Sequence, residues 1–559
     1  MIYNDVMVKE DGIYLMKTSK TGELEELRVG NYLDIESQMV NIDSNEYTVK
    51  LVYQPANCLK RLKVVANLSE ISSGQGLLSL AKYGVDVNEF NKSILVKSLR
   101  NSREIAPYYY NHHSLGFKFN NDEIHFHHYY VLGMEEDSTY IGDFNIKPLG
   151  SHSIYMQMIE NEVLGHTPLE LGLVLGASSA LIGLLGEKYS IENLFFHLVG
   201  DSSTGKSTVA MLATSIWGSP ILAENGLLTT WNATLNSIQK RLSGNTGVAL
   251  CLDEISQYTG KDATKVIYSL TEGTTRSRLN KDSELKIGGH WRTTILSTGE
   301  RSLIEAGSQN TGLRVRLLEL ELKQWTRNAE NSNQIKRIIS QHYGLLGLEF
   351  VEYILSIGVE EMYRLFEEYE QYMISLLPET AIKTRLASKL AIILMTSTLL
   401  ENMGIGINVD NIERLLLKQF SQIGVEADLG IKAYEQLMQY LSSNQSKFIC
   451  QYARRGTSGV YDYSPSHCQG RIKFDSNNQM EEVAINAKEF KSIISSLGFE
   501  SERVLLKNWK EKGWLDYEEN KLQKRLIINN TRISCIVLKV GLIERYLKEM
   551  ELDLVKLSV

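Results

Sequence analysis

The sequence predicts a multi-domain α/β protein whose central domain is a parallel sheet with a phosphate-binding loop. The first observation is an apolar run, Leu194–Val199, that leads directly into the glycine-bounded turn GDSSTGKST. The second is an apolar strand at 248–252 that ends in the two acids Asp253 and Glu254. The third is an apolar strand at 293–296 that ends in STGE. Continuous apolar strands are typical of a parallel sheet that is covered on both faces.

Length and composition predict several globular domains. A chain of 559 residues with 43% hydrophobic residues and 7 prolines is too long for one core, and we expect about three to five domains. The net charge of −8 argues against a uniformly basic surface for nucleic acid but leaves room for local basic faces. Five scattered cysteines with no C-x-x-C pair fit a reducing cytoplasm and no structural zinc. The start of the chain has no secretion leader, and the most apolar window, 171–185, is shorter than a membrane span and predicts a buried helix, so we expect no membrane association.

The first 105 residues are expected to form a β-rich accessory domain. Residues 13–71 contain β-branched and aromatic runs that turn residues interrupt, and 76–103 has helical spacing of its leucines. The basic run at 59–63 predicts either a contact with nucleic acid or a solvated strand edge that discourages pairing.

Residues 106–185 are expected to lead, with strands and helices, into the domain that carries the phosphate-binding loop. This segment is rich in histidine: His112, His113, His125, His127 and His128. Alternation on a strand would place His125 and His127 on one face, which is a geometry that can hold a metal. No cysteine or paired carboxylate completes the set, so structural histidines are the expectation and a metal site is the alternative.

The turn after Leu194–Val199 has the G-x-x-x-x-G-K-[ST] spacing, with Gly200, Gly205, Lys206 and Ser207 in its fixed positions. The backbone N–H groups of such a loop and the start of the following helix bind phosphate, the lysine reaches the β and γ phosphates, and the Ser207 hydroxyl binds Mg²⁺. The expected nucleotide ligands are Gly200, Asp201, Ser202, Ser203, Thr204, Gly205, Lys206, Ser207 and Thr208.

The ends of the other two core strands supply the expected catalytic groups. Asp253 would hold the magnesium shell and Glu254 would polarise the attacking water, because acids at the carboxyl end of a strand about forty residues after a phosphate loop take these roles. On the third strand, Ser297 or Thr298 would sense the γ phosphate.

Basic side chains after this strand are candidates for the same chemistry. Arg314 or Arg316 could supply charge to the γ phosphate of a neighbouring subunit, or form an ordinary salt bridge. The core is expected at 186–325, and the helical pattern that follows predicts a lid at 326–440. Within the lid, Arg385 or Lys389 could reach the phosphates or, alternatively, cap a helix-packing face.

Two elements are candidates for contact with DNA. The segment 276–287 has strand residues on both sides of a turn, which predicts a β-hairpin with Lys281 near its tip. Residues 441–559 are expected to form a linker and a winged helix, with helices at 487–497 and from 501, a stop at Gly513 and strands beyond it. Arg503, Lys507 and Lys510 fall on one face of the second helix, which predicts groove binding, although a winged helix used only for protein contacts has the same pattern.

These motifs together resemble those of the MCM-like AAA+ replication helicases of staphylococcal cassette chromosome and pathogenicity-island elements, the cassette chromosome helicase type. The resemblance rests on five motifs and covers about residues 110–420. They are GDSSTGKST, the Thr230-Trp231-Asn232-Ala233-Thr234 element, CLDE, the STGE that ends the third strand, and the arginine pair after Gly312. This sequence departs from the family pattern at the sensor position, where it has Ser297 and Thr298 and many AAA+ relatives carry asparagine.

The resemblance implies a fold and an activity. The fold is an AAA+ P-loop ATPase core with a helical lid, a β-rich N-terminal domain and a C-terminal winged helix. The activity is that of a hexameric, DNA-stimulated ATPase that uses ATP and Mg²⁺, unwinds duplex DNA from 3′ to 5′ and helps a mobile element replicate. Arg316 or Arg314 would complete a neighbour's nucleotide site, and the hairpin around Lys281 would line the channel and contact one strand. The winged helix would load the ring at an origin, and replication proteins of the element are candidate partners.

Two other functions remain open. One is a DNA-bound AAA+ switch or initiator that hydrolyses ATP to change shape and assembles with partners without unwinding DNA. The other is a primase-helicase, which is disfavoured because the N-terminal region shows no paired-carboxylate catalytic core.

Overall fold

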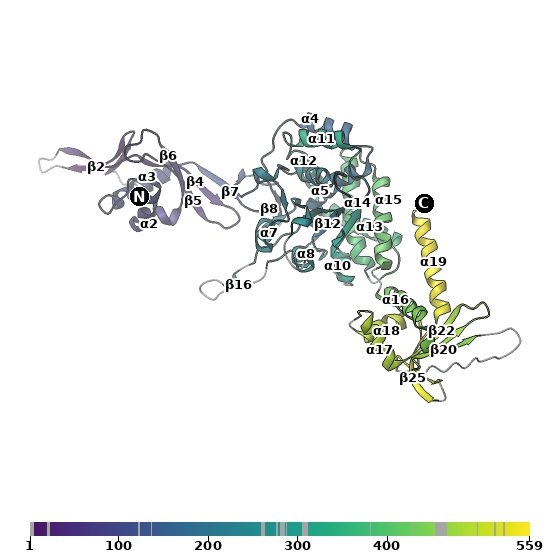
Figure 1. Cartoon of the computed structure of the whole chain (residues 1–559). Helices are drawn as coiled ribbons and strands as arrows, with labels where there is room; N and C mark the ends of the chain where they lie inside the picture. The colour runs from purple at the N-terminus through teal and green to yellow at the C-terminus, as the bar shows by residue number, and fades with distance from the viewer. Residues whose placement is uncertain are drawn as a thin grey trace.

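The computed structural model has three regions along the chain, with the N-terminal domain and the C-terminal domain on either side of a central body (Figure 1). The structure describes residues 5–18, 23–120, 123–135, 137–258, 263–275, 278–279, 285–286, 288–303, 311–380, 382–426, 429–452, 467–499, 501–518, 521–528 and 531–558.

The N-terminal domain is β-rich, as expected. A three-stranded sheet has the order β1-β2-β3 and a five-stranded sheet has the order β11-β7-β4-β5-β6. The strands are β1 (Val6–Lys9), β2 (Gly12–Thr18), β3 (Leu24–Gly30), β4 (Leu33–Asn41), β5 (Tyr47–Tyr53), β6 (Leu62–Asn67), β7 (Tyr108–His112) and β11 (Ser138–Tyr140). The helices are α1 (Leu68–Ile71), α2 (Gly74–Leu78), the 3₁₀ turn η1 (Ser79–Tyr83) and α3 (Lys92–Ile105), which packs against β4.

The domain does not stop at residue 105. Because β7 pairs in parallel with β4, and β11 in parallel with β7, the chain continues this sheet as far as Tyr140. Strand β6 is the edge strand next to the basic run at 59–63. Arg61 in that run stacks over the Tyr32 ring and donates to the Glu10 carbonyl, while Lys63 pairs with Glu36.

The segment between this domain and the core forms a small sheet with the order β10-β9-β8-β14. Its strands are β8 (Leu115–Asn120), β9 (Glu123–His127), β10 (Val131–Leu132) and β14 (Asn245–Thr246). The last strand comes from the core itself, so hydrogen bonds of the sheet join the lead-in segment to the central body.

The central body contains a five-stranded parallel sheet with the order β13-β15-β18-β12-β19. The strands are β12 (Leu194–Val199), β13 (Leu228–Thr230), β15 (Leu250–Asp253), β18 (Thr294–Gly299) and β19 (Leu317–Glu321). All six residues of β12 and all six of β18 are buried, which confirms the expectation from their apolar runs. Strand β18 therefore stands between the loop-bearing strand β12 and the acidic strand β15.

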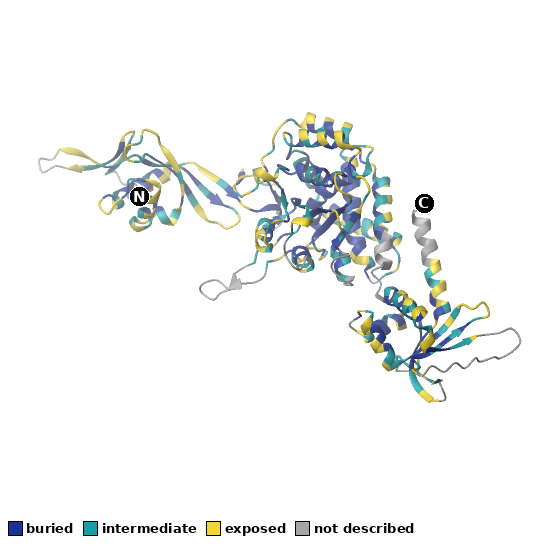
Figure 2. Ribbon diagram, viewed as in Figure 1, coloured by how far each residue is buried: buried dark blue, intermediate teal, exposed yellow. Residues whose placement is uncertain are grey.

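Helices cover this sheet, as Figures 1 and 2 show. They include α4 (His152–Met158), the π-helical turn η2 (Ile159–Val163), α5 (Thr167–Leu185), α6 (Lys206–Ser215), η3 (Leu222–Glu224), α7 (Leu235–Leu242), η4 (Ile255–Gln257), α8 (Ala263–Glu272) and α10 (Thr311–Arg316). Helix α5 is long and apolar enough to cross a membrane, but 94% of its most apolar window is buried inside the protein. It packs against α6 and α14, so the expectation of a buried core helix is confirmed.

The helices expected to form a separate lid share the core of the sheet. They are α11 (Ala329–Ile339), α12 (Leu346–Ile357), α13 (Val359–Leu376), α14 (Lys383–Asn402) and α15 (Val409–Glu426). One continuous hydrophobic cluster runs from Leu115 through the sheet to Phe420. The boundary expected at 326 is therefore a boundary in sequence pattern and not between two cores, because α14 is buried against α5, α13 and α15.

The C-terminal domain begins with α16 (Leu429–Ser443) rather than at residue 441. Ile431, Tyr434 and Leu437 of α16 belong to the hydrophobic cluster of this domain. Its sheet has the order β20-β21-β22-β25-β23, with β24 paired to β25. The other elements are η5 (Gln445–Lys447), β20 (Phe448–Tyr452), β21 (Gly470–Phe474), β22 (Met480–Asn486), α17 (Ala487–Ser496), α18 (Glu502–Glu511), β23 (Leu515–Asp516), β24 (Lys524–Ile528), β25 (Thr531–Leu538) and α19 (Val540–Ser558).

The expected order of helix, turn, helix and hairpin is present in this domain. Ser501 caps α18 by accepting a hydrogen bond from the Val504 amide, and Gly513 has a φ of 71°, which ends the helix as glycine commonly does. Strands β24 and β25 then form an antiparallel hairpin. The segment expected to be a connector contributes β20 and β21, which pair in parallel.

Candidate functional site: a phosphate-binding loop at the carboxyl end of the sheet

The loop between β12 and α6 has the backbone that its glycines require. Ser203 has a φ of 63° and Gly205 a φ of 98°, both in the left-handed region that glycine adopts at little cost. A Cβ atom on Gly205 would lie 2.5 Å from the Thr326 side chain, and one on Gly200 would lie 2.8 Å from the Leu322 carbonyl oxygen. Both glycines are therefore needed for the close approach of the segment after β19.

That segment supports the loop from behind. The Trp325 indole donates to the Val199 carbonyl at 2.9 Å, and the Trp325 amide donates to the Thr204 carbonyl at 2.9 Å. The Thr204 hydroxyl in turn donates to the Asp201 carbonyl at 2.9 Å. Sequence reasoning missed Trp325, because no motif marks a residue that acts only by holding another loop in place.

Lys206 and Ser207 begin α6 next to the loop. The buried Lys206 ammonium donates to the carbonyl oxygens of Gly200 at 2.8 Å and Asp201 at 2.7 Å, so it lies over the loop. The Ser207 hydroxyl donates to Asp253 Oδ1 at 3.0 Å. The structure thus brings the lysine, the hydroxyl and the first acid of β15 to one edge of the sheet.

Thr208 differs from its neighbours. Its hydroxyl is buried and forms a hydrogen bond of 2.6 Å with Ser332 on α11, so its side chain does not face the loop. Only its backbone N–H, in the first turn of α6, is placed to contribute to phosphate binding.

The structure separates the two sensor candidates on β18. Thr298 donates to Asp253 Oδ1 at 2.5 Å and accepts a hydrogen bond of 2.9 Å from the Glu254 amide. Ser297 instead bonds His197 Nδ1 and the Trp231 indole, each at 2.9 Å. Successive side chains on a strand point to opposite faces, so only Thr298 reaches the acids.

Glu254 stands at the end of β15 in a constrained conformation. Its φ of 59° and ψ of 82° are unusual for a residue with a Cβ, and such strain clusters at functional sites. Its carboxylate accepts a hydrogen bond from the Ser256 amide at 3.3 Å.

The Thr230-Trp231-Asn232-Ala233-Thr234 element has a structural role beside this site. The Trp231 indole is fully buried, stacks on Phe195 of β12 and donates to Ser297. Thr234 caps α7 by accepting from the Ser237 amide. The sequence motif includes Trp231, but it does not identify His197, which bonds the same Ser297 hydroxyl from β12. Burial lowers the pKa of His197 to about 4, so this imidazole is neutral.

The two arginines of α10 lie at the opposite end of the sheet from the loop. Leu317, the residue after Arg316, pairs with Phe195 at the start of β12, whereas the loop follows Val199. Five residues separate Phe195 from Gly200, so at about 3.3 Å per residue the backbone of Arg316 lies more than about 16 Å from the phosphate loop of its own chain. Arg316 forms an ion pair of 3.0 Å with Glu192 and its guanidinium lies over the Tyr268 ring.

Basic residues of α14 lie at this same end of the sheet, where the parallel strands begin. Lys389 is buried and donates to the Val315 carbonyl at 2.9 Å, and burial, set against Glu192, lowers its pKa to about 8. Arg385 is exposed one turn earlier and acts electrostatically on Lys389. Arg316 and Arg385 both act electrostatically on Lys389, so Arg385 lies on the side of Arg316, and a contact of Arg385 with phosphate stays a prediction. Lys389 fills the packing role that was its alternative.

The residues at the loop fit ATP with Mg²⁺. The loop offers backbone N–H groups and an ammonium for phosphate, and the Ser207 hydroxyl and Asp253 carboxylate supply the oxygen ligands that Mg²⁺ prefers. Among the described residues there is no group of three His, Cys, Asp or Glu side chains that could hold a metal by itself.

The histidine-rich segment has structural contacts. His112 bonds Ser138 and the His128 carbonyl, and His128 bonds the Trp217 carbonyl. Burial lowers the pKa of both rings to about 4, which keeps them neutral. His127 bonds the Ser114 hydroxyl at 2.9 Å. These contacts support the structural reading of the histidines.

The structure describes the candidates for DNA contact on α18 but not the one at the tip of the hairpin. On α18, Arg503, Lys507 and Lys510 are exposed on one face, while Leu505, Leu506 and Trp509 are buried. At the hairpin, β16 (Arg278–Leu279) pairs antiparallel with β17 (Leu285–Lys286), and Lys281 lies outside the described residues. Arg314 is half-buried on α10.

The fold and this site define a multi-domain α/β protein with β-rich N-terminal sheets, a parallel core that carries a phosphate-binding loop, and a C-terminal helix-turn-helix domain. The chain belongs to the family described as a domain of unknown function, DUF927, whose model matches residues 6–289. A second model, described as the Cch helix turn helix domain, matches residues 428–542 and agrees with a domain that begins at α16.

One solved structure is similar over nearly the whole chain. It is titled "SCCmec type IV Cch - active helicase", is 22% identical, has a TM-score of 0.74, and the match covers 97% of this chain and 99% of that one. The expected resemblance to the cassette chromosome helicase type is thereby confirmed for the fold. No curated protein matches.

Proposed function

We propose that this chain is an ATP-dependent replicative DNA helicase of a mobile genetic element. The observation that carries the proposal is the cluster of Lys206, Ser207, Asp253, Glu254 and Thr298 at one edge of the sheet, in a chain whose fold matches an active helicase from end to end. The strand order, with β18 between the loop strand and the acidic strand, supports an AAA+ core.

Each residue of the cluster has a role in ATP hydrolysis. Lys206 and the loop amides would hold the phosphates, and Ser207 and Asp253 would hold Mg²⁺, which would supply positive charge to the transferred phosphate. Thr298 orients Asp253 and the backbone of Glu254 through one hydroxyl. Glu254 accepts the proton of the attacking water, since it is the second acid and is not bonded to Ser207.

The position of the arginines, at the end of the sheet opposite the loop, favours a ring-shaped assembly. Arg316, or Arg314, and Arg385 lie too far from their own loop to touch its nucleotide, but head-to-tail packing would bring them to the loop of the next subunit. A homo-hexamer is the assembly that the resemblance implies. We therefore assign these arginines to the neighbour's site.

DNA is the proposed substrate at two places. The hairpin that carries Lys281 would follow the backbone of one strand, with 3′ to 5′ polarity taken from the resemblance, and α18 would bind duplex DNA and load the ring at an origin. Other replication proteins of the element are candidate partners, and the cytoplasm is the expected location.

Strand displacement on a forked DNA tests the proposal. The parent protein with ATP and Mg²⁺ should release the labelled strand, and Glu254→Gln should bind ATP but release none. ATP hydrolysis without displacement, on forks of either tail polarity, would favour the alternative of a DNA-bound AAA+ switch.

A second variant separates the same two functions. Lys281→Ala should abolish unwinding and leave the ATPase rate intact if the hairpin contacts the translocating strand. Unwinding at the parent rate would remove the channel role of this residue.

A further inference from the structure

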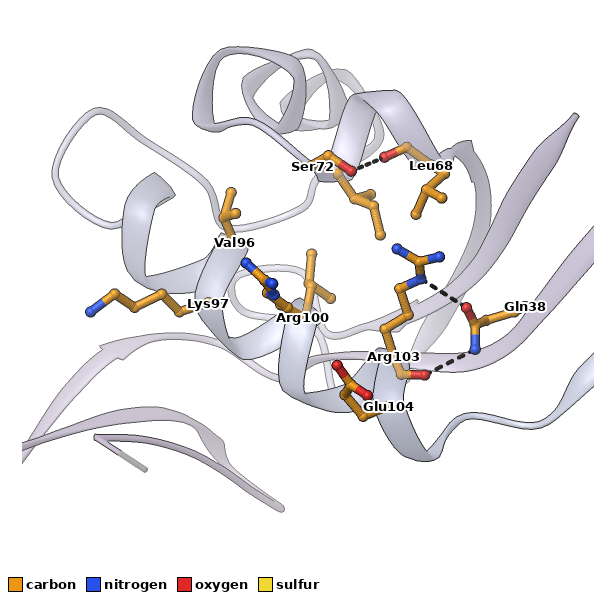
Figure 3. Close-up of a pocket in the computed structure, with 10 residues that line it drawn as sticks. Gln38, Leu68, Ser72, Val96, Lys97, Arg100, Arg103 and Glu104 are labelled. Carbon is orange, nitrogen blue, oxygen red and sulfur yellow. Dashed lines mark hydrogen bonds between the residues drawn. The ribbon is translucent and has the colours of Figure 1, made fainter. Parts of the chain in front are cut away.

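The N-terminal domain contains a cavity of about 550 Å³ that the proposed ATPase site does not use. It lies between α1, one face of α3 and strand β4, and Figure 3 shows its lining. The polar part of the lining is Gln38, Ser72, Lys97, Arg100, Arg103 and Glu104. The remaining walls are aliphatic side chains of α1 and α3, so the cavity combines charge with apolar surface, as small ligand sites do.

Arg103 is fixed in this cavity by a reciprocal clamp. Its Nε donates to Gln38 Oε1 at 2.9 Å, and Gln38 Nε2 donates back to the Arg103 carbonyl at 2.9 Å. Figure 3 shows the far end of the guanidinium pointing away from Gln38, toward Leu68. A guanidinium held by one edge presents its other N–H groups as a rigid fork, which suits a phosphate.

The charge of the lining favours an anion. Arg100 and Arg103 are three residues apart on α3 and therefore share one face of the helix. Lys97 forms an ion pair with Asp5 at 3.2 Å. Glu104 is the one carboxylate among the residues that line the cavity. The lining therefore carries three cationic side chains and one carboxylate, and its net charge favours an anion.

A row of tyrosines continues from the cavity along the same face of the sheet. Gln38 is the register partner of Tyr108 in the parallel pair β4–β7, so both side chains project from one face. Tyr108 is 43% exposed. Its ring meets Tyr47 at 6.3 Å and Tyr110 at 5.9 Å, both edge to face.

We propose that Arg100, Arg103 and the Tyr108 row form a binding site for single-stranded DNA in the N-terminal domain. The arginines bind consecutive phosphates at the cavity, and Tyr108 stacks on a base, which is the combination of cationic groove and aromatic platform that binds single strands without sequence preference. This site is separate from the hairpin and from α18, and it does not require that the chain hydrolyse ATP.

Photocrosslinking tests the site directly in the full-length protein. An oligo(dT) that carries 5-iododeoxyuridine should crosslink to Tyr108 or Tyr47, as identified by mass spectrometry of the peptides. The variant Arg100→Ala/Arg103→Ala should lose this crosslink and reduce the slope of log affinity against log salt by about 1.4, since each single-strand phosphate contact contributes about 0.7.

The matched control is Lys17→Ala/Lys50→Ala, which removes two cations of the same domain that do not line the cavity. It should keep the crosslink. ATPase rates of both variants without DNA should equal that of the parent, which distinguishes loss of this site from failure of the proposed ATPase.

Competition identifies the source of the phosphate. Millimolar dTMP should not displace the oligonucleotide from Tyr108 if a strand is the ligand. If dTMP displaces the oligonucleotide from Tyr108, the single-strand assignment is wrong, and the site binds a small phosphorylated ligand. A crosslink pattern that avoids the N-terminal domain, with an unchanged salt slope in the arginine variant, would overturn the site altogether.

Discussion

The Thr298 hydroxyl lies 2.5 Å from Asp253 Oδ1 and at the same time accepts a hydrogen bond from the Glu254 amide. One side chain thereby binds the Asp253 carboxylate at the end of β15 and the backbone of Glu254 directly after it. A variant of this residue should disturb metal binding and water activation together.

Thr298→Ala should lower the ATPase rate by about tenfold to a hundredfold, because a small displacement of a positioned catalytic group has an effect of this size. Thr298→Ser keeps the hydroxyl and should retain most of the activity. Ser297→Ala removes the neighbouring hydroxyl that bonds His197 and Trp231, so it should lower thermal stability more than the rate. Equal rate losses in the two alanine variants would contradict the division of roles.

Mixed assemblies test whether Arg316 acts across a subunit boundary. Arg316→Ala and Glu254→Gln should each be inactive alone, but a mixture should regain ATPase activity, because some sites would combine an intact Glu254 with a neighbour's intact Arg316. Steady-state hydrolysis across mixing ratios measures this. If every ratio stays inactive, Arg316 acts within its own chain, through its ion pair with Glu192.

Neutralising Arg503, Lys507 and Lys510 on α18 should weaken duplex binding and reduce the salt slope by about 2.7, since each duplex phosphate contact contributes about 0.9. Fluorescence anisotropy at several salt concentrations measures the slope. The matched control replaces Lys488 and Lys491 of α17 by alanine. An unaltered slope would make this helix a surface for protein contacts.

Lys389 predicts a pH dependence of stability. Its pKa is about 8 in the folded protein against 10.5 for an ordinary lysine, so between these values the unfolded chain binds more protons. The free energy of unfolding should therefore rise with pH across this window, by up to about 1.4 kcal/mol per pH unit, and the penalty should be complete below pH 8.

Urea denaturation from pH 7 to 10 measures this for the parent and for Lys389→Met, which lacks the titrating group. The parent should gain stability relative to the variant as the pH rises. Lys418→Met removes an exposed lysine from α15 and should follow the parent. Parallel curves for parent and Lys389→Met would show that Lys389 is not buried as a titrating group.

The local patterns of the sequence predicted the elements well. The apolar runs of β12, β15 and β18 and the fixed spacing of Gly200, Gly205 and Lys206 identified the loop, because both signals depend only on neighbouring residues. The same holds for α18 and its hairpin, where a capping serine and a stopping glycine set the ends of the helix.

Relationships between distant segments could not be predicted in this way. Alternation along β18 leaves open which of Ser297 and Thr298 faces the acids until the partners His197 and Trp231 are in place. Similarly, the pairing of β7 with β4 extends the N-terminal domain past residue 105, and Trp325 supports a loop more than a hundred residues earlier in the chain. The sequence leaves two roles open for Lys389, because its bond partner Val315 lies more than seventy residues earlier in the chain.

The single hydrophobic cluster from Leu115 to Phe420 has a mechanical consequence. A hinge between the sheet and helices α11–α15 would have to expose leucine and isoleucine side chains, at about 1.5 to 3 kcal/mol for each one. The phosphate loop and the arginines at the opposite end of the sheet should therefore move together as one rigid body. In the proposed ring, ATP hydrolysis would then change the contacts between subunits, or between this body and the domains on either side of it, and not the packing inside it.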